Sequence, residues 1–573
     1  MQQIPNQSTS ASSESGTRQA CSNCTASFEI TDDDRVFYDQ VSPVFHGKKY
    51  PIPTPEMCSE CRLQRRMMFR NDRNFYHRKS DQSGKDIMTI YSPDKPYVVY
   101  DKTEWWGDKW NPLDYGRDFD FSRTFAEQWQ ELRLQVPRAN LFTSNEENSY
   151  YTNHSLNMKN CYLIWGGGDD EDCLFGNFIT YCKDMVDGLS VFYSERSYQG
   201  ISSERCYDCI EFHNCRDCID CIMVEDCTSC TKCIGCFGLH RKKYCIFNEE
   251  VPKEVWEQRR AELGCINQEN TAMLRAKLDA LKKNLPHRGS HIYASENCTG
   301  DCIFNSKNCE HSFDINNCED CKYISFTPKG VSSYDCCFTA PEGLELSYFV
   351  CSSLGGQRML FTFLAYYCSD TYYSMECHHC NHLFGCASLR NNQYCIFNKQ
   401  YGKEEYEKLA GRIAEHMMET GEWGRFFSPA LAPICYNESN AIDYFPITKQ
   451  EALAKGWSWR DEDPVKENGE ILESVPNTIE GMDDSICDRI LICNKTGKPY
   501  KIIPQELKFY RDMNIALPQK CPVARHQERM NLRNPRRLWS RTCAKCEKEI
   551  QTNYSPERPE KVVCESCYLD TVY

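Results

Sequence analysis

The sequence lacks any apolar run of the roughly 18 residues that a transmembrane helix needs. Residues 1–20 are polar and serine-rich, without the apolar core of a secretory signal peptide. The chain also contains no GxxxxGK[ST] phosphate loop, no HExxH helix and no GxSxG elbow. These absences argue against a membrane protein, a secreted precursor and the common motif-defined enzymes.

Positive charge is also in short supply. The formal net charge is −15 and the pI is near 5.5, which argues against a protein coated for nucleic acid or membrane surfaces. The 39 cysteines cannot all pair with one another, because their number is odd. We therefore expect a cytoplasmic protein whose cysteines are metal ligands or small buried side chains. An extracellular disulfide ladder remains the alternative.

The cysteines recur with a period of 12 residues. The equivalent positions are Cys206, Cys218 and Cys230, then Cys209, Cys221, Cys233 and Cys245, then Cys215 and Cys227. A short fixed period is typical of solenoids, in which each repeat buries its inner face only against its neighbours. The pentapeptide Tyr-Cys-Ile-Phe-Asn ends one such region at 244–248 and recurs at 394–398, each time before a charged amphipathic segment. The pattern predicts a parallel β-solenoid in two tandem blocks.

Two CxxC pairs lie close to the start of the chain, Cys21 with Cys24 and Cys58 with Cys61. Each pair presents two thiolates from one tight turn, and two such turns complete a tetrahedral zinc site. A site of four thiolates has no open coordination position, so the expected role of the zinc is structural.

These CxxC pairs, the Phe37-Tyr38 pair and the proline-rich approach to Cys58 resemble the zinc-ribbon (treble-clef-like) domain of bacterial proteins. The whole chain is similar to cysteine-rich proteins of uncultivated candidate-phyla bacteria, which place such modules around a cysteine-repeat centre. The resemblance implies the module fold and zinc. It implies no activity, because none is established for that family.

Residues 58–104 align without a gap with residues 521–567, so the module occurs twice. The second copy has a CxxC pair of its own at Cys543 and Cys546 and another at Cys564 and Cys567, which predicts a second zinc ion. The first copy has Ser80, Ser83, Asp101 and Glu104 at those positions. The counterpart of the first site keeps only Cys493 and Cys521, with Cys487 and His526 as candidate replacements for the lost ligands.

Arginines interleaved with aromatic residues follow Cys61 and Cys521. Such strips can hold phosphates and stack bases, so we predict that they contact a macromolecular partner, with nucleic acid as the candidate. The alternative is a solvated basic helix that pairs with the acidic surface of this same chain. The predicted contact residues are Arg62, Arg65, Arg66, Arg70, Arg73, Arg78, Arg525, Arg529, Arg533, Arg536, Arg537 and Arg541.

The CxxC units inside the repeats are harder to interpret. Residues three apart on an extended strand face opposite sides, so we expect repeat cysteines to be structural and to bind metal only at a turn. Cys377-His378-His379-Cys380 is the candidate exception, and an iron–sulfur or other metal role for the repeats stays open.

The predicted fold is mainly β, a two-block parallel β-solenoid with helical inserts between two homologous zinc-ribbon modules. The predicted parts are a disordered tail (1–20), an N-terminal zinc-binding module (21–104), a tryptophan-rich and helical cap (105–145), two solenoid blocks (146–249 and 291–399) separated by a helical insert (250–290), a helix and linker (400–485) and a C-terminal zinc-binding module (486–573).

The predicted function is that of a non-enzymatic, zinc-stabilised binding or scaffold protein. A cysteine-based metal-handling or redox protein is the first alternative. A carbohydrate-active β-helix is the second, although nothing in the sequence singles out a pair of catalytic carboxylates.

Overall fold

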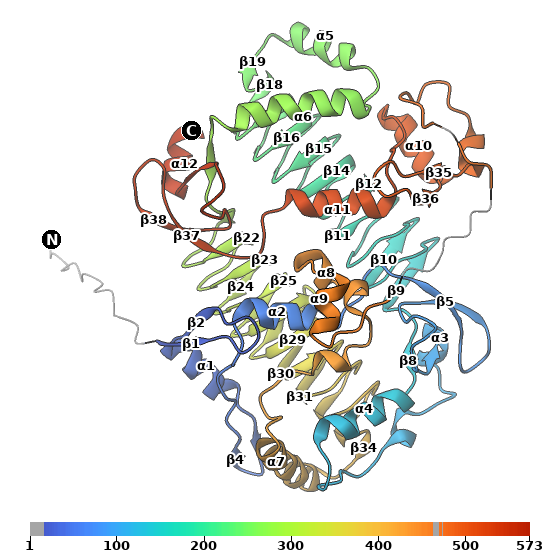
Figure 1. The fold of residues 1–573 in the computed structure, drawn as a ribbon, viewed down its shortest axis with the longest axis vertical. Coiled ribbons are helices and arrows are strands. Elements are labelled where there is room, and N and C mark those ends of the chain that lie inside the picture. The colour runs from blue at the N-terminus through green and yellow to red at the C-terminus, as the bar shows by residue number, and fades with distance from the viewer. Residues whose placement is uncertain (1–15, 462–468, 473, 573) are drawn as a thin grey trace, which may run out of the picture.

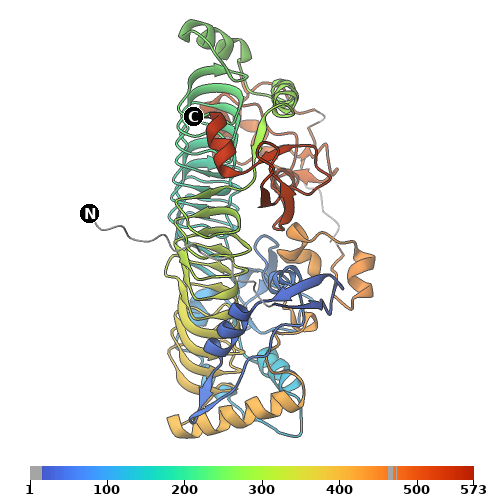
Figure 2. The ribbon, with the colours of Figure 1, turned by 90° about the vertical axis from the view of Figure 1, so that its left-hand side faces the viewer.

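The computed structural model describes residues 16–461, 469–472 and 474–572. It is rich in strands, most of them in two long parallel sheets, with a cluster of four cysteines towards each end of the chain. Figures 1 and 2 show the short strands stacked into a column, with the N- and C-terminal segments gathered along one side. No helix in the described residues is long and apolar enough to span a lipid bilayer.

We call residues 143–250 block 1. It contains β9 (Thr143–Glu147), β10 (Ser155–Lys159), β11 (Asn177–Thr180), β12 (Lys183–Val186), β13 (Leu189–Phe192), β14 (Glu195–Glu204), β15 (Ile210–His213), β16 (Ile222–Glu225), β17 (Thr231–Phe237), β18 (Lys243–Ile246) and β19 (Glu249–Glu250). Its parallel register steps by 12 residues per coil, as in the pairing of Ile210 with Ile222, Ile222 with Ile234 and Ile234 with Ile246.

Block 2 comprises residues 292–400. Its strands are β21 (Ile292–Tyr293), β22 (Gly300–Phe304), β23 (Ser312–Asn316), β24 (Cys318–Glu319), β25 (Ser325–Thr327), β26 (Gly330–Val331), β27 (Tyr334–Thr339), β28 (Leu344–Glu345), β29 (Tyr348–Ser353), β30 (Gly356–Phe363), β31 (Cys368–Tyr372), β32 (Asn381–Phe384), β33 (Gln393–Ile396) and β34 (Lys399–Gln400). Most coils again step by 12 residues, but Tyr334 pairs with Tyr348, a step of 14.

Every third residue of the coils adopts a left-handed conformation. In block 1, Asp217, Asp220 and Asp226 each have φ of 53°, and each is followed by a buried cysteine. The left-handed residue turns the chain, so residues three apart point into the same interior. Our expectation that residues three apart face opposite sides is therefore wrong for these coils, because it assumed continuous extended strands. The frequent Asn and Asp at these positions are the signal that sequence reasoning missed.

The two blocks lie side by side, and the chain runs through their coils in opposite directions. Asp226 of block 1 contacts His291, whereas Phe178, several coils earlier, stacks on Phe326 at 4.5 Å and on Phe338 at 5.4 Å between ring centroids. Residue numbers therefore fall in one block as they rise in the other. Figure 1 shows β9 to β18 rising towards the top and β22 to β34 descending to the bottom.

Each block ends in the same way. The backbone N–H of Phe237 donates to Asn248 Oδ1 at 2.9 Å, and that of Ala387 donates to Asn398 Oδ1 at the same distance. Each pentapeptide then turns into a short antiparallel strand, β19 or β34, which ends the parallel ladder. The helices that follow are α5 (Lys253–Leu263) and α6 (Gln268–Lys282) after block 1 and α7 (Lys403–Glu419) after block 2.

The N-terminal segment contains β1 (Thr17–Ala20), β2 (Ser27–Ile30), α1 (Asp32–Val41), β3 (Val44–Phe45), β4 (Lys48–Lys49), α2 (Ser59–Met67), β5 (Tyr76–Lys79), β6 (Asp86–Thr89), β7 (Val99–Tyr100), α3 (Lys102–Trp106), η1 (Pro112–Tyr115), α4 (Phe125–Gln135) and β8 (Arg138–Ala139). Residues 17–20 of the predicted tail thus form a strand, and residues 1–15 lie outside the described part. Thr124 caps α4. Trp105 packs on His378 of block 2.

The C-terminal segment contains η2 (Pro429–Leu431), η3 (Tyr436–Glu438), α8 (Ala441–Tyr444), α9 (Lys449–Ala454), η4 (Asp484–Asp488), β35 (Leu491–Ile492), β36 (Pro499–Tyr500), α10 (Pro504–Met513), α11 (Pro522–Leu532), β37 (Trp539–Thr542), β38 (Glu549–Thr552), β39 (Lys561–Val563) and α12 (Glu565–Val572); β20 (Pro286–Arg288) pairs with β39. Tyr436 and Trp457 are buried and stack at 5.0 Å, so this part of the predicted linker belongs to the core.

The left-handed positions give a stability test. Asn157 has φ of 54°, where a β-branched side chain is strained and glycine is not. We expect Asn157→Val to unfold more easily than Asn157→Gly by about 1–2 kcal/mol, measured by urea denaturation. Both variants lose the amide bonds to Asn145 and Asp169, so the comparison isolates backbone strain. Equal stabilities would contradict the assignment.

Candidate metal centres and arginine clamps

The first cysteine cluster is built from a turn and a helix start. Cys21 and Cys24 flank the turn between β1 and β2, Cys58 is the N-cap residue of α2, and Cys61 lies in its first turn. The four sulfur atoms lie within 4.8 Å of one another. Cys24 Sγ and Cys58 Sγ are 3.7 Å apart. Four thiolates about 2.3 Å from a tetrahedral zinc ion would be separated by about 3.8 Å, so the donor set fits zinc.

The second cluster repeats this design. Cys543 and Cys546 lie in the turn between β37 and β38, and Cys564 and Cys567 lie at the start of α12. Cys546 Sγ and Cys564 Sγ are 3.6 Å apart. The predicted pairing of the eight cysteines into two groups is confirmed, and the residues present could hold one metal ion in each group.

Backbone N–H groups point at sulfur in both clusters. The N–H of Cys58 donates to Cys21 Sγ at 3.3 Å, and the N–H of Cys564 donates to Cys543 Sγ at 3.2 Å. Such donors stabilise the thiolate form that a metal ion requires. Because all four ligands at each site come from the protein, neither site offers a position for a substrate or an activated water.

Each module also contains the counterpart of the other module's cysteine cluster, but these two counterparts lack the full set of four cysteines. Ser80 donates to Glu104 where the second cluster has Cys543 and Cys567. Thr496 Oγ1 lies 3.8 Å from Cys521 Sγ at the counterpart of the first cluster. His526 instead contacts Arg73 and Asp443, and no third ligand group is found in the described residues. Cys487, Cys493, Cys521 and His526 are thus not assembled into a metal site.

The repeat cysteines are buried inside the coils, as expected for structural residues. Within the part of the chain that the structure describes, they form no group of three or more ligands close enough for one metal ion. At the candidate exception, Cys377 and Cys380 point inward, while His378 packs against Trp105 and Trp106 at 5.2 Å.

The arginines after Cys61 face inward rather than outward. Arg62 Nε lies 2.9 Å from Asp335 Oδ2, and Arg66 Nη1 lies 2.7 Å from Asp335 Oδ1. Asp335 is fully buried in block 2. Figure 1 shows α2 lying across the strands of this block. The three side chains form what we call an arginine clamp.

The C-terminal module forms the same clamp on block 1. Arg525 Nε lies 2.9 Å from Asp187 Oδ2, and Arg529 Nη1 lies 2.7 Å from Asp187 Oδ1. Arg525 and Arg529 are the duplicated counterparts of Arg62 and Arg66, and Asp187 is also fully buried. Each module therefore docks through two arginines that share one carboxylate.

The equivalence extends to the coil before each aspartate. Arg66 donates to the carbonyl of Tyr323 and Arg529 donates to that of Phe175, both at 3.4 Å. Both carbonyls lie 12 residues before the clamped aspartate. The guanidinium groups of Arg62 and Arg525 lie over the Tyr323 and Phe175 rings at 4.9 and 4.7 Å, which adds cation–π attraction.

Most of the other predicted contact arginines are also engaged within the protein. Their partners are Phe427 for Arg65, Asp72 and Ser352 for Arg70, Asp443 for Arg73, Tyr97 for Arg78, Asp314 for Arg533 and Arg536, and Glu560 for Arg541. Arg537 is half exposed and pairs with Glu60 of the other module at 3.2 Å.

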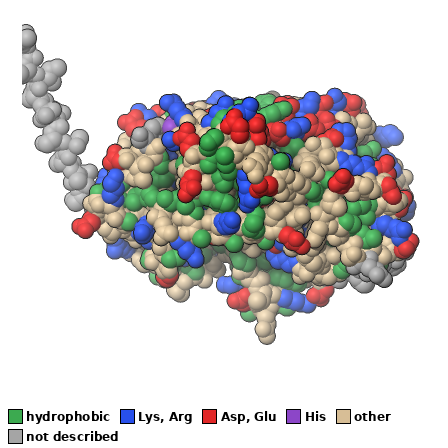
Figure 3. All heavy atoms as spheres, turned by 90° about the horizontal axis from the view of Figure 1, so that it is seen from above, with side chains coloured by type: hydrophobic (Ala, Val, Ile, Leu, Met, Phe, Trp, Pro, Cys, Tyr) green, Lys and Arg blue, Asp and Glu red, His purple; other side chains and the backbone are tan. Residues whose placement is uncertain are grey.

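The predicted basic contact strips therefore need correction. Guanidinium groups that are buried and paired with carboxylates of the same chain are not accessible to the phosphates of a partner, and those of the two clamps bind the modules to the blocks. The alternative of a solvated basic helix is correct in that the arginines pair with acidic groups of the same chain, but the paired side chains are buried rather than solvated. From above, the exposed Lys and Arg side chains are interspersed with Asp and Glu (Figure 3).

No protein-family model matches the chain, and none of the curated proteins matches it.

The blocks are joined by a histidine held between two carboxylates. His291 Nε2 lies 2.9 Å from Asp226 Oδ1, and its Nδ1 lies 2.9 Å from Asp301 Oδ1. Burial alone would lower the pKa of His291, but Asp301 and Asp226 raise it to about 10. Burial opposes ionisation of Asp301, yet the imidazolium lowers the pKa of that carboxyl to about 2.

This triad predicts a pH dependence. Because the folded pKa of His291 lies above the unfolded value of about 6.5, its contribution to stability is complete below that pH and is lost as the pH rises towards 10. We expect His291→Gln to flatten the decline of the free energy of unfolding between pH 6 and pH 9. The exposed His46, changed to Asn, is the control. Parallel curves for His291→Gln and wild type would contradict the assignment.

The clamps predict large losses of stability, with the larger loss at Asp335. Asp335→Asn leaves the buried Arg62 and Arg66 without a carboxylate and should cost about 3–5 kcal/mol. Asp187→Asn should cost less, because Arg525 keeps the buried carboxylate of Glu506 at 3.2 Å and only Arg529 loses its carboxylate. Asp217→Asn breaks an exposed pair with Arg205 and should cost about 0–1 kcal/mol. Denaturant unfolding monitored by circular dichroism measures all three. A small effect at Asp187 or Asp335 would show that the clamps contribute little.

Proposed function

We propose that this protein is a non-enzymatic scaffold, in which two parallel β-solenoid blocks are locked together by two zinc-stabilised modules of one origin. The observation that carries the proposal is the pair of arginine clamps. The modules direct their arginines at the blocks, and their four-cysteine sites have no open position for catalysis.

The regular 12-residue register supports the solenoid part of the proposal. Stacked coils of this kind form a continuous interior, and their strand edges need protection at both ends. The asparagine-capped pentapeptides and the helices α5 and α7 supply that protection at one end of each block. A long rigid body with protected ends suits a binding or scaffold role.

Metal binding is connected to the first clamp through one helix. Cys58 caps α2, Cys61 lies in α2, and Arg62 and Arg66 project from the same helix onto block 2. A zinc ion on the two cysteines would fix the position and direction of α2. In the C-terminal module, α11 carries the clamp but its own metal site has only Cys493 and Cys521 left. Zinc should therefore matter more for the N-terminal clamp.

The chain crosses between the blocks. The N-terminal module precedes block 1 but clamps block 2, and the C-terminal module follows block 2 but clamps block 1. The modules also touch each other where Arg73 Nη1 lies 3.2 Å from His526 Nε2. Two crossed connections hold the blocks more firmly than a single linker, which is what a scaffold of fixed shape requires.

The first test is the metal and thiol content of protein purified under reducing conditions. Eight of the 39 cysteines belong to the two clusters, so we expect about two zinc ions per chain and, once denaturation with a chelator has released them, 39 titratable thiols. Elemental analysis and a thiol assay measure both. Iron, or many more metal ions, would overturn the proposal in favour of a metal-handling protein.

Chelation tests the connection to the clamp. Removing zinc should increase proteolysis around α2 and lower the melting temperature, because α2 loses its anchor. Cys61→Ser should do the same, whereas Cys230→Ser, inside the coils, should leave metal content unchanged. Metal loss without any change in proteolysis around α2 would show that zinc does not support the first clamp.

A further inference from the structure

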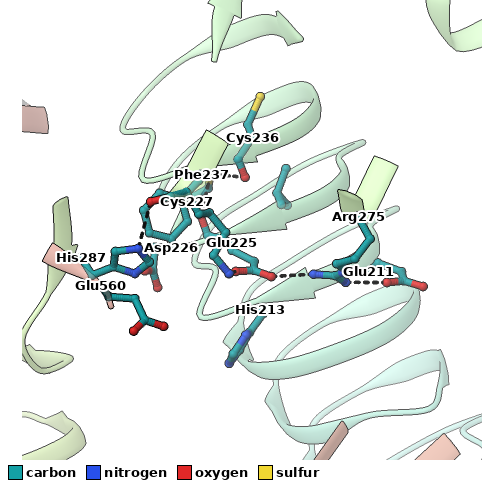
Figure 4. A network of polar contacts seen from close by, with 12 residues as sticks. Glu211, His213, Glu225, Asp226, Cys227, Cys236, Phe237, Arg275, His287 and Glu560 are labelled. Carbon is teal, nitrogen blue, oxygen red and sulfur yellow. Dashed lines mark hydrogen bonds and ion pairs between the residues drawn. The ribbon is translucent and has the colours of Figure 1, made fainter. Parts of the chain in front are cut away.

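A polar cavity lies where block 1, the β20 segment, block 2 and the C-terminal module meet. Its volume is about 90 Å³, several times the roughly 10–15 Å³ that one water molecule requires. Residues from all four parts line it, among them His213, Asp226, Asp301, Cys302, Arg533 and Arg536. Figure 4 shows part of its wall, with His287 beside Asp226 and with His213 apart from the Glu225–Arg275–Glu211 network.

One side of the cavity carries an excess negative charge. Asp226 and Asp301 share the single imidazolium of His291, so two carboxylates are balanced by one cation. The carboxylate of Asp226 makes no further hydrogen bond within the described residues, while Asp301 Oδ2 accepts from Asn553 at 2.6 Å. The nearby Glu225 is separately neutralised by Arg275 and Lys282.

The other side carries the opposite excess. Arg533 and Arg536 share the single carboxylate of Asp314, so two cations are balanced by one anion. The Nε of Arg536 is buried without a hydrogen-bond acceptor. Arg558, also in the wall, is separately neutralised by Glu560. Both sides of the cavity thus lack one unit of compensating charge.

The two sides are close enough to act on one group. Cys302 directly follows Asp301, and Asp314 lies one coil further on, because Asp301 pairs with Phe313 in the parallel register; all three line the same cavity. Burial, Asp301 and Asp314 raise the pKa of the Cys302 thiol, whereas Arg533 and Arg536 lower it. The ring of His213 also faces the cavity and has no hydrogen-bond partner in the described part of the chain. Burial lowers the pKa of His213 to about 4, so at neutral pH the ring offers one donor and one acceptor.

We propose that this cavity binds a small zwitterion of the α-amino acid class, with its ammonium group towards Asp226 and Asp301 and its carboxylate towards Arg533 and Arg536. Buried charges require partners, and a molecule that carries both signs a few bonds apart supplies one to each side. A molecule with a single charge would compensate one side and leave the other unpaired. The proposal does not depend on the metal sites.

The test is isothermal titration calorimetry of the full-length, zinc-loaded protein with glycine, L-alanine and L-serine, compared with methylammonium and acetate. We expect at least one amino acid to bind with a stoichiometry of one, and both singly charged probes to bind at least tenfold more weakly. Asp226→Asn and Arg536→Gln should each weaken amino acid binding at least tenfold. Arg358→Gln, which removes an exposed ion pair with Asp370 outside the cavity, should not.

A second pair of variants leaves every charge in place. Cys302→Met fills the cavity and should abolish binding, whereas Cys298→Met, on the same block but outside the cavity, should preserve it. Circular dichroism confirms that each variant is folded. The proposal is overturned if no amino acid binds at millimolar concentration, if acetate or methylammonium binds as tightly, or if folded Cys302→Met binds like wild type.

Discussion

A buried carboxylate shared by two arginines is the interaction on which the arrangement of the parts depends. Asp187 and Asp335 are fully buried, and each would be strongly destabilising without its two guanidinium partners. Each partner pair arrives on a helix from a module far away in the sequence. The blocks can therefore keep these aspartates only while both modules are docked, so folding of the modules and of the blocks is coupled.

The need for contacts that fix the two blocks together explains why the chain has its two small modules. A stack of coils satisfies its backbone along the column but has no means of fixing a second stack beside it. The clamps, the His291 triad and the ring stack of Phe178 on Phe326 supply that contact at successive heights. A metal ion at the first cluster would have a clear structural purpose, because it would hold the helix that presents Arg62 and Arg66.

Much of this could be predicted because it is local or periodic. The spacing of the CxxC pairs predicts the two groups of four cysteines that the structure brings together. The 12-residue step of the repeat cysteines matches the register of the parallel strands. The orientation of the repeat cysteines could not be predicted from alternation, since the left-handed residue at every third position changes which side chains share a face. The role of the arginines was also missed, because strips of alternating basic and aromatic residues suit a buried ion pair as well as a phosphate.

The sequence by itself determined the repeats, the duplicated module, the eight clustered cysteines and the caps of the blocks, since each depends on residues near one another or at a fixed period. Only the tertiary structure decided that the blocks run in opposite directions, that each module clamps the block further from it along the chain, and that charges of both signs surround one cavity. These features join residues more than a hundred positions apart. They follow from burial and charge pairing, for which the linear order of residues carries no signal.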